Sequence, residues 1–293
     1  MICKTPHTFN RGGQLTTVSC GRCMPCRVNR AMDWAFRLEQ EMERCTTAHF
    51  LTLTYRDEDL TRNDSGHPVL VKSDLQKFWK RVRHRTDKIQ NEMIDQLLYK
   101  ESIVFPRIRY YSVGEYGDES WRPHYHAIAF NIPKEVLEDL QTIWKHGFVK
   151  IGTVTPGSIK YVTKYVTKVD SRDLDLRDLP KPFNAMSKGI GENYVTDETK
   201  EYHSRTETKL HIVKDYVRRL PTYYHSRIHN LEDAETAFTI LQYKKTRQRE
   251  AKKAMEKKID EILARGEHVY TILRAEERNE LIKYKLNNKR NKL

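Results

Sequence analysis

Apolar and polar side chains follow two different periodicities along the chain, and these predict strands and helices. Residues 50–55, FLTLTY, alternate with period two, so a strand is expected with Leu51 and Leu53 facing the core. Residues 27–43 lack glycine and proline and carry apolar side chains at helical spacing, which predicts an amphipathic helix. A second helix is expected with Ser73 as its N-cap and with many lysines and arginines on its outer face.

A β-hairpin is predicted downstream of these elements. Residues 107–113 and 123–132 are rich in strand-forming side chains, and the glycine, acidic and serine residues between them favour a turn. Counting outward from a turn centred near residues 119 and 120 places Glu115 across from His124. A register shift of one residue would instead move Glu115 to the other face of the sheet.

The remaining periodic segments complete an α+β pattern. A helix is expected from Pro133 to residue 144, a strand at residues 147–154, and a further helix introduced by Pro156 and Gly157. The order strand, helix, strand, strand, helix, strand, helix predicts a mostly antiparallel central sheet backed by helices.

The chain is strongly basic, with a formal net charge of +13 and a pI near 9.4. The last 50 residues hold 16 Lys and Arg against 8 Asp and Glu, so they account for +8 of this charge, and their spacing predicts a charged helical tail. Such a charge favours a polyanionic partner, and nucleic acid is expected ahead of a membrane surface. No apolar run approaches the roughly 18 residues of a membrane span, and the N-terminus lacks a signal-peptide pattern, so a cytoplasmic location is expected.

Four of the five cysteines, Cys3, Cys20, Cys23 and Cys26, crowd the N-terminus, and Cys45 stands apart. In a cytoplasmic chain this argues against a disulfide framework. Three thiolates on a tight turn, completed by Cys3, could hold a structural zinc ion with four sulfur ligands. A reduced cluster without metal and an iron–sulfur cluster are the alternatives.

Two short motifs suggest chemistry. His124 and His126 are two residues apart in a predicted strand, so their side chains would project from one face and could share one ion. Tyr161 and Tyr165 are four residues apart in a predicted helix, which stacks two phenols on one side. Glu115 is the expected third ligand, with Asp118 and Glu119 as its rivals.

These residues carry a resemblance to a known family. The chain resembles the replication initiators of microviruses, which are small circular single-stranded DNA phages, and most of all those of the gokushovirus branch. The resemblance extends from residue 1 to about residue 230 and rests on segments in the same order. They are CGRCMPCR at residues 20–27, FLTLTY at 50–55, GEYG at 114–117 running into RPHYH at 122–126, and YVTKYVTK at 161–168.

The resemblance implies an HUH endonuclease of the two-tyrosine type, named for two histidines that flank a hydrophobic residue, here Tyr125. It implies a sheet that bears the histidines, with the tyrosine helix packed beside it. Residues 1–48 would be a cysteine-rich turn and helix, residues 49–230 the endonuclease domain with a wrapping extension, and residues 231–293 a basic helical tail.

The implied activity is the nicking and rejoining of origin DNA for rolling-circle replication. A tyrosine would attack a phosphodiester and leave a covalent 5′-phosphotyrosine and a free 3′-hydroxyl. Two imidazoles and a carboxylate leave open positions for the phosphate on Mg²⁺ or Mn²⁺. Lys164 and Lys168 each follow a tyrosine by three residues and could favour the phenolate or hold phosphates. Hydrolysis by zinc-bound water would leave the paired tyrosines unexplained.

The expected partners are single-stranded origin DNA and the helicase and replication polymerase of a bacterial host, because the chain carries no Walker motif. DNA contacts are expected from four basic side chains: Arg122, Lys77, Lys80 and Arg81. The alternatives are a non-catalytic single-stranded DNA-binding protein, which would use phosphate contacts and stacking, and an HUH transposase or plasmid initiator.

Overall fold

The computed structural model describes residue 3 and residues 5–11, 13–95, 105–164, 175–206, 210–213, 216–228 and 234–290. The chain divides into two compact units. The first unit is Trp34–Asn193, and the second combines Met1–Asp33 with Tyr194–Leu293.

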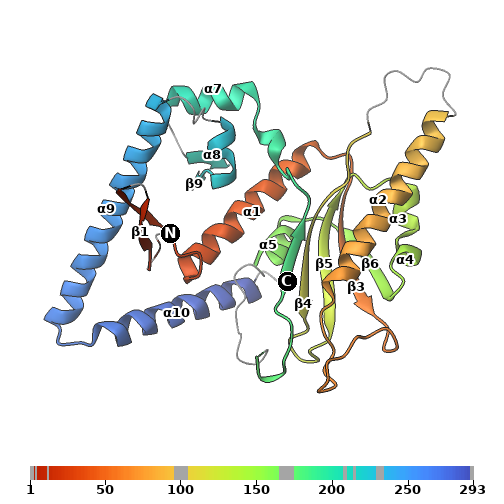
Figure 1. Ribbon diagram of the computed structural model, residues 1–293, viewed down its shortest axis with the longest axis horizontal. Helices are drawn as coiled ribbons and strands as arrows, with labels where there is room; N and C mark the ends of the chain where they lie inside the picture. The colour runs from red at the N-terminus through yellow and green to blue at the C-terminus, as the bar shows by residue number, and fades with distance from the viewer. Residues whose placement is uncertain are drawn as a thin grey trace. The chain divides into compact units, whose positions relative to one another are not determined.

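The first unit is built around an antiparallel sheet. Among the described residues it has five strands in the order β6-β3-β5-β4-β7 (Figure 1). The strands are β3 Ala48–Tyr55, β4 Arg109–Tyr116, β5 Pro123–Phe130, β6 Gly147–Thr153 and β7 Phe183–Met186. This confirms the α+β fold with a mostly antiparallel sheet that the sequence predicts, and it places the strand with the two histidines at the centre.

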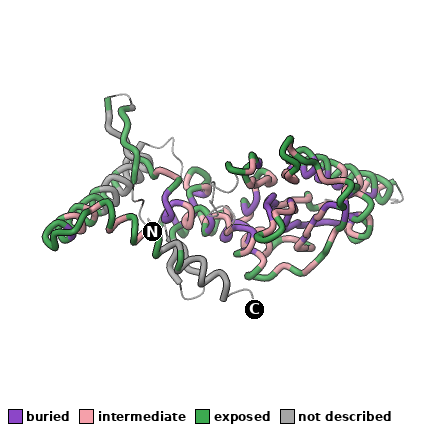
Figure 2. The backbone as a smooth tube through the Cα atoms, turned by 90° about the horizontal axis from the view of Figure 1, so that it is seen from below, coloured by how far each residue is buried: buried purple, intermediate pink, exposed green. Residues whose placement is uncertain are grey.

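Helices cover both faces of this sheet (Figure 1). They are α1 Met24–Arg44, which begins in the second unit, α2 Lys72–Asp95, α3 Lys134–Glu138, α4 Leu140–Ile143 and α5 Pro156–Lys164. On one face, Leu51 and Leu53 of β3 pack with Trp79 of α2 and with α3 and α4. On the other face, Ile128 of β5 packs with residues of α1 and α5. The buried positions of both layers are the purple stretches of Figure 2.

The β4–β5 hairpin has the predicted register, because Glu115 pairs directly with His124. The amide of Gly117 donates to the carbonyl of Arg122 at 3.0 Å and so closes the turn. Trp121 adopts a positive φ of 52° in this turn, which few non-glycine residues do. Glu115 therefore shares a face with the histidines.

Several element boundaries differ from those that the sequence predicts. Helix α2 begins at Lys72, so Ser73 lies inside its first turn and not at its N-cap. The helix expected after Pro133 is split at Asp139 into the short α3 and α4. The sequence pattern does not predict strand β7, which extends the sheet through pairing with β4.

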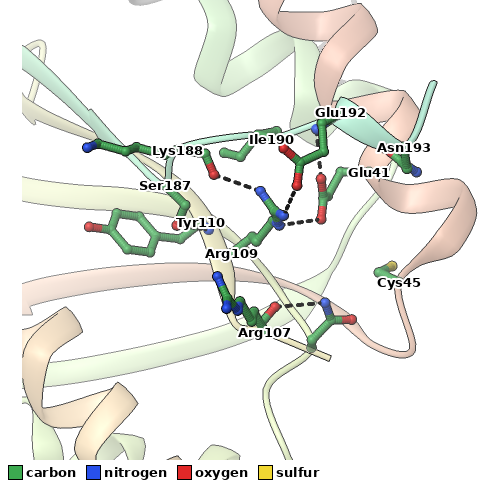
Figure 3. A network of polar contacts seen from close by, with 12 residues as sticks. Glu41, Cys45, Arg107, Arg109, Tyr110, Ser187, Lys188, Ile190, Glu192 and Asn193 are labelled. Carbon is green, nitrogen blue, oxygen red and sulfur yellow. Dashed lines mark hydrogen bonds and ion pairs between the residues drawn. The ribbon is translucent and has the colours of Figure 1, made fainter. Parts of the chain in front are cut away.

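The segment that follows β7 is fastened to the sheet by Arg109 of β4 (Figure 3). The guanidinium donates to the carbonyl of Lys188 at 2.6 Å and forms ion pairs with Glu192 and with Glu41 of α1. The second oxygen of Glu41 accepts from the amide of Gly191 at 2.7 Å. One arginine thus joins a strand, a helix and the segment after β7.

The second unit contains a small hairpin followed by short elements and two long helices. Its elements are β1 His7–Arg11, β2 Gln14–Val18, η1 Glu192–Tyr194 at the boundary, α7 Asp197–Thr206, β8 Leu210–Val213, β9 Tyr216–Arg219, α8 Thr222–Ile228, α9 Ala234–Ala264 and α10 Val269–Arg290. The predicted helical tail is present, but it breaks at Gly266, whose φ of 69° suits glycine. In the described part of the chain, no helix has the length and apolarity needed to cross a membrane.

Candidate active site

Glu115, His124 and His126 meet on the face of the sheet that α5 covers. Glu115 Oε1 lies 3.2 Å from Nε2 of His124 and 3.2 Å from Nε2 of His126. One ligand atom from each residue lies within 4.8 Å of the others, so the group could hold a metal ion. The Glu115 carboxylate is almost fully buried, with 3% of its side chain exposed, whereas 20% of the His124 side chain is exposed.

The second nitrogen of each imidazole has a partner that fixes the ring. His124 Nδ1 lies 3.1 Å from the carbonyl oxygen of Arg122, and His126 Nδ1 lies 3.0 Å from Oγ1 of Thr52. Both Nε2 atoms therefore face Glu115. Burial lowers the pKa of His126, which favours the neutral ring. Neutral imidazoles oriented through their second nitrogen are the usual form of histidine as a metal ligand.

Tyr161 brings a phenol to the same group. It lies on α5, and its hydroxyl donates to Glu115 Oε1 at 3.2 Å and lies 3.3 Å from Nε2 of His126. The ammonium of Lys164 lies 4.0 Å from the centre of the Tyr161 ring, which is a cation–π contact. A tyrosine hydroxyl and a candidate metal group thus occupy one site.

Other residues predicted for this site have different positions. Tyr165 and Lys168 lie outside the described residues. Asp118 and Glu119, the rivals of Glu115, are exposed in the hairpin turn and are not members of the metal-ligand group.

Tyr125, between the two histidines, points to the opposite face. It is fully buried, its hydroxyl donates to the carbonyl of Val71 at 2.9 Å, and it lies 2.7 Å from the hydroxyl of Tyr55. Burial raises the pKa of Tyr125 to about 12. This phenol belongs to the core and is remote from the histidine face.

The four basic residues predicted to contact DNA lie in different surroundings. The Arg122 guanidinium is held by Asp57 at 2.5 Å and by the carbonyl of Tyr55 at 2.6 Å. Lys77 and Lys80 are exposed and Arg81 is half-buried, all on α2, which covers the face opposite the histidines. Their role in DNA binding stays a prediction.

Two contributors to the site are not anticipated from the sequence. Thr52 holds His126, and the Phe50 ring stacks on the same imidazole with centroids 5.4 Å apart. The signal for both is the alternation of FLTLTY, because its positions opposite Leu51 and Leu53 must share the histidine face.

The second unit contains a separate group of four cysteines. Cys3, Cys20, Cys23 and Cys26 place their sulfurs within 4.8 Å of one another, and all four are free thiols. The sulfurs of Cys23 and Cys3 are 3.8 Å apart, and those of Cys20 and Cys26 are 4.0 Å apart. A tetrahedral ion with metal–sulfur bonds of about 2.3 Å needs sulfurs about 3.8 Å apart, so these cysteines fit one ion.

Local backbone donors support Cys20 in this group. The amides of Arg22 and Cys23 donate to its sulfur at 3.4 Å and 3.3 Å, across a turn in which Gly21 has a φ of 71°. Burial raises the pKa of Cys20, but hydrogen bonds from the Thr5 hydroxyl and these amides outweigh burial and lower it to about 5. The thiolate that a metal requires is thus favoured at this position.

Comparisons with known proteins agree with the motifs. Residues 48–170 match the family model of the phage replication-associated protein ORF2. Over 257 residues the chain is 28% identical to the replication-associated protein ORF2 of Spiroplasma virus 4, which covers 82% of this chain and 75% of that protein. It is 30% identical to the replication-associated protein VP4 of Bdellovibrio phage phiMH2K over 66% of this chain and 61% of that protein. No solved structure matches.

A third relative is the replication-associated protein ORF4 of Chlamydia phage 1, which is 26% identical over 78% of this chain and 58% of that protein. The chain thus spans about six-tenths of the length of the last two relatives. The matches confirm the predicted resemblance: the chain is related to the replication-associated proteins of microviruses.

Proposed function

We propose that this chain initiates rolling-circle replication of a small circular single-stranded DNA phage by nicking and rejoining origin DNA. The observation that carries the proposal is the Tyr161 hydroxyl, 3.2 Å from a carboxylate that also contacts two imidazole Nε2 atoms. A binding protein would have no need for such a group, whereas a tyrosine nuclease needs a nucleophile beside a site for a cation.

Glu115, His124 and His126 would hold Mg²⁺ or Mn²⁺. The donor set fits, because both Nε2 atoms and the carboxylate converge and both Nδ1 atoms already have partners. When bound, the ion would offset the negative charge that develops on the phosphate oxygens.

Tyr161 would supply the nucleophile. Its phenolic oxygen would form a bond to phosphorus as the bond from phosphorus to the 3′-oxygen breaks, and that oxygen would leave as a 3′-hydroxyl with a proton. The product is a 5′-phosphotyrosine, and attack by a 3′-hydroxyl on this linkage rejoins the strand without a nucleotide cofactor. Lys164, beside the phenol, would contact flanking phosphates. Tyr165 would allow a second cleavage while the first strand is still attached.

The four N-terminal cysteines would hold a structural zinc ion. The geometry favours one ion over a four-iron cluster, because the thiolates of a cluster bind separate irons and must lie further apart. The ion would tie Cys3, ahead of the β1–β2 hairpin, to the start of α1.

The proposed partners are single-stranded origin DNA together with the helicase and polymerase of the bacterial host, in whose cytoplasm the protein would act. The chain would provide a primer end for the polymerase, and strand separation would fall to the host enzyme.

Cleavage of labelled origin DNA in Mg²⁺ or Mn²⁺ and in EDTA tests the proposal. The double variant His124→Ala, His126→Ala is expected to lose nicking and to retain most DNA binding, because phosphate contacts are distributed over the surface. The control is His84→Ala, which removes an exposed histidine of α2. Nicking by the double variant at the rate of the unaltered protein would refute the metal site, and binding without cleavage in any metal would favour a non-catalytic DNA-binding protein.

A further inference from the structure

Strand β6, at one edge of the sheet, carries an exposed aromatic side chain in line with the candidate metal group. In the strand register, Phe148 pairs with Thr54 of β3, Thr54 pairs with His124 of β5, and His124 pairs with Glu115 of β4. Directly paired residues of an antiparallel sheet project to the same face. Neighbouring strands are about 4.8 Å apart, so Phe148 lies roughly 10 Å from His124 along this row.

The next row repeats the arrangement with a cation at the edge. Lys150 pairs with Thr52, and Thr52 pairs with His126. Lys150 is exposed, and both threonines are half-buried. From the edge inward, each row therefore presents a group suited to DNA, a hydroxyl and a metal-ligating imidazole.

Packing does not account for Phe148. Its neighbour Val149 points to the opposite face and packs against the core there, whereas the Phe148 side chain remains 62% exposed. A single exposed phenylalanine is common by itself. Here it shares a face with an exposed lysine and ends a row that leads to the candidate active site.

We propose that the face of β6 bearing Phe148 and Lys150 binds single-stranded DNA beside the scissile phosphate. Phe148 stacks on a base, and Lys150 contacts a backbone phosphate. The inference rests on the proposed function, since that function makes single-stranded DNA the occupant of the neighbouring group. Aromatic side chains with nearby cations are the usual means of binding single strands, because every base offers a face for stacking.

Fluorescence anisotropy of labelled oligothymidylate in EDTA tests this without cleavage. Stacking contributes about 1–3 kcal/mol per base, so Phe148→Ala is expected to raise Kd roughly 5- to 150-fold, and Phe148→Trp is expected to bind like the unaltered protein. Lys150→Ala is expected to weaken binding and to reduce the dependence of log Kd on log salt by about one unit.

The control is Ile151→Ala, which removes another exposed apolar side chain of β6 that points to the opposite face. It should leave Kd unchanged. Unaltered binding by Phe148→Ala would overturn the proposal, as would an equal loss in Ile151→Ala. A change of oligomeric state in Phe148→Ala with unaltered DNA binding would overturn it too and assign this face to a second copy of the chain.

Because the titration is done in EDTA, its outcome is separate from that of the nicking assay. Binding that depends on Phe148 in a protein that never cleaves would overturn the nuclease and leave this inference standing. Cleavage with binding that ignores Phe148 would do the reverse.

Discussion

His126 has a hydroxyl neighbour at each ring nitrogen: Thr52 at Nδ1 and Tyr161 at Nε2. For Nε2 to offer a lone pair to a metal, Nδ1 must carry the proton and donate it to Thr52. The threonine thereby sets both the tautomer and the orientation of the ring. His124 achieves the same with the backbone carbonyl of Arg122, which no side-chain substitution removes.

Thr52→Val keeps the shape of the side chain and removes this hydroxyl. It is expected to weaken Mn²⁺ binding about 10- to 100-fold, as the loss of a partner that orients a ligand usually does. Loss of the free-ion signal in electron paramagnetic resonance measures the binding. The control is Thr54→Val on the same face, whose hydroxyl contacts the carbonyl of Phe148 and no histidine. Equal Mn²⁺ affinities for the two variants would contradict the role of Thr52.

At the level of elements, the site depends on how closely β6 approaches β3. Gly147 lies so near β3 that a Cβ atom there would be 2.1 Å from the carbonyl oxygen of Thr54 and 2.8 Å from the amide of Arg56. At Gly152, at the other end of the strand, the nearest atom would be 3.7 Å away. The two glycines of β6 therefore differ in what they allow.

Gly147→Ala is expected to lower the free energy of unfolding by about 1–3 kcal/mol, because backbone atoms must move to admit the methyl group. Gly152→Ala should change it little, since the methyl group meets only ordinary contacts. Chemical denaturation followed by circular dichroism compares the variants. A Gly147→Ala protein as stable as Gly152→Ala would show that β6 pairs less closely than described.

Local periodicity allows the strands of the sheet core, the first helices and the pairing of Glu115 with His124 to be predicted, because each depends on neighbours along the chain. Strand β7 cannot be predicted in this way. It joins β4 across a long sequence separation, and its four residues carry no clear alternation. The break at Gly266 and the contact of Thr52 with His126 escape prediction for related reasons: one glycine is a weak signal, and a cross-strand contact requires the strand order.

At the level of the whole molecule, the two units differ in what stabilises their described parts. The sheet unit has two apolar clusters, one on each face. The N-terminal part of the other unit is a hairpin with five residues in each strand, next to the cysteine group. A small hairpin has little core to stabilise it, so a metal is expected to contribute most of the order there.

The protein is expected to bind one zinc ion per chain, and Cys23→Ser should lose the ion and melt at a lower temperature. Elemental analysis and thermal denaturation measure both effects. Cys45→Ser is the matched control, because Cys45 lies outside the group and donates to the carbonyl of Met42. Iron in place of zinc, or zinc retained in Cys23→Ser, would contradict the assignment.

The most direct test of the account is formation of a covalent protein–DNA adduct. Labelled single-stranded origin DNA would be incubated with the protein in Mn²⁺ or in EDTA and resolved on a denaturing protein gel. A metal-dependent adduct that is absent from the double variant Tyr161→Phe, Tyr165→Phe is the predicted result. Cleavage without any adduct would contradict tyrosine attack and make water the nucleophile.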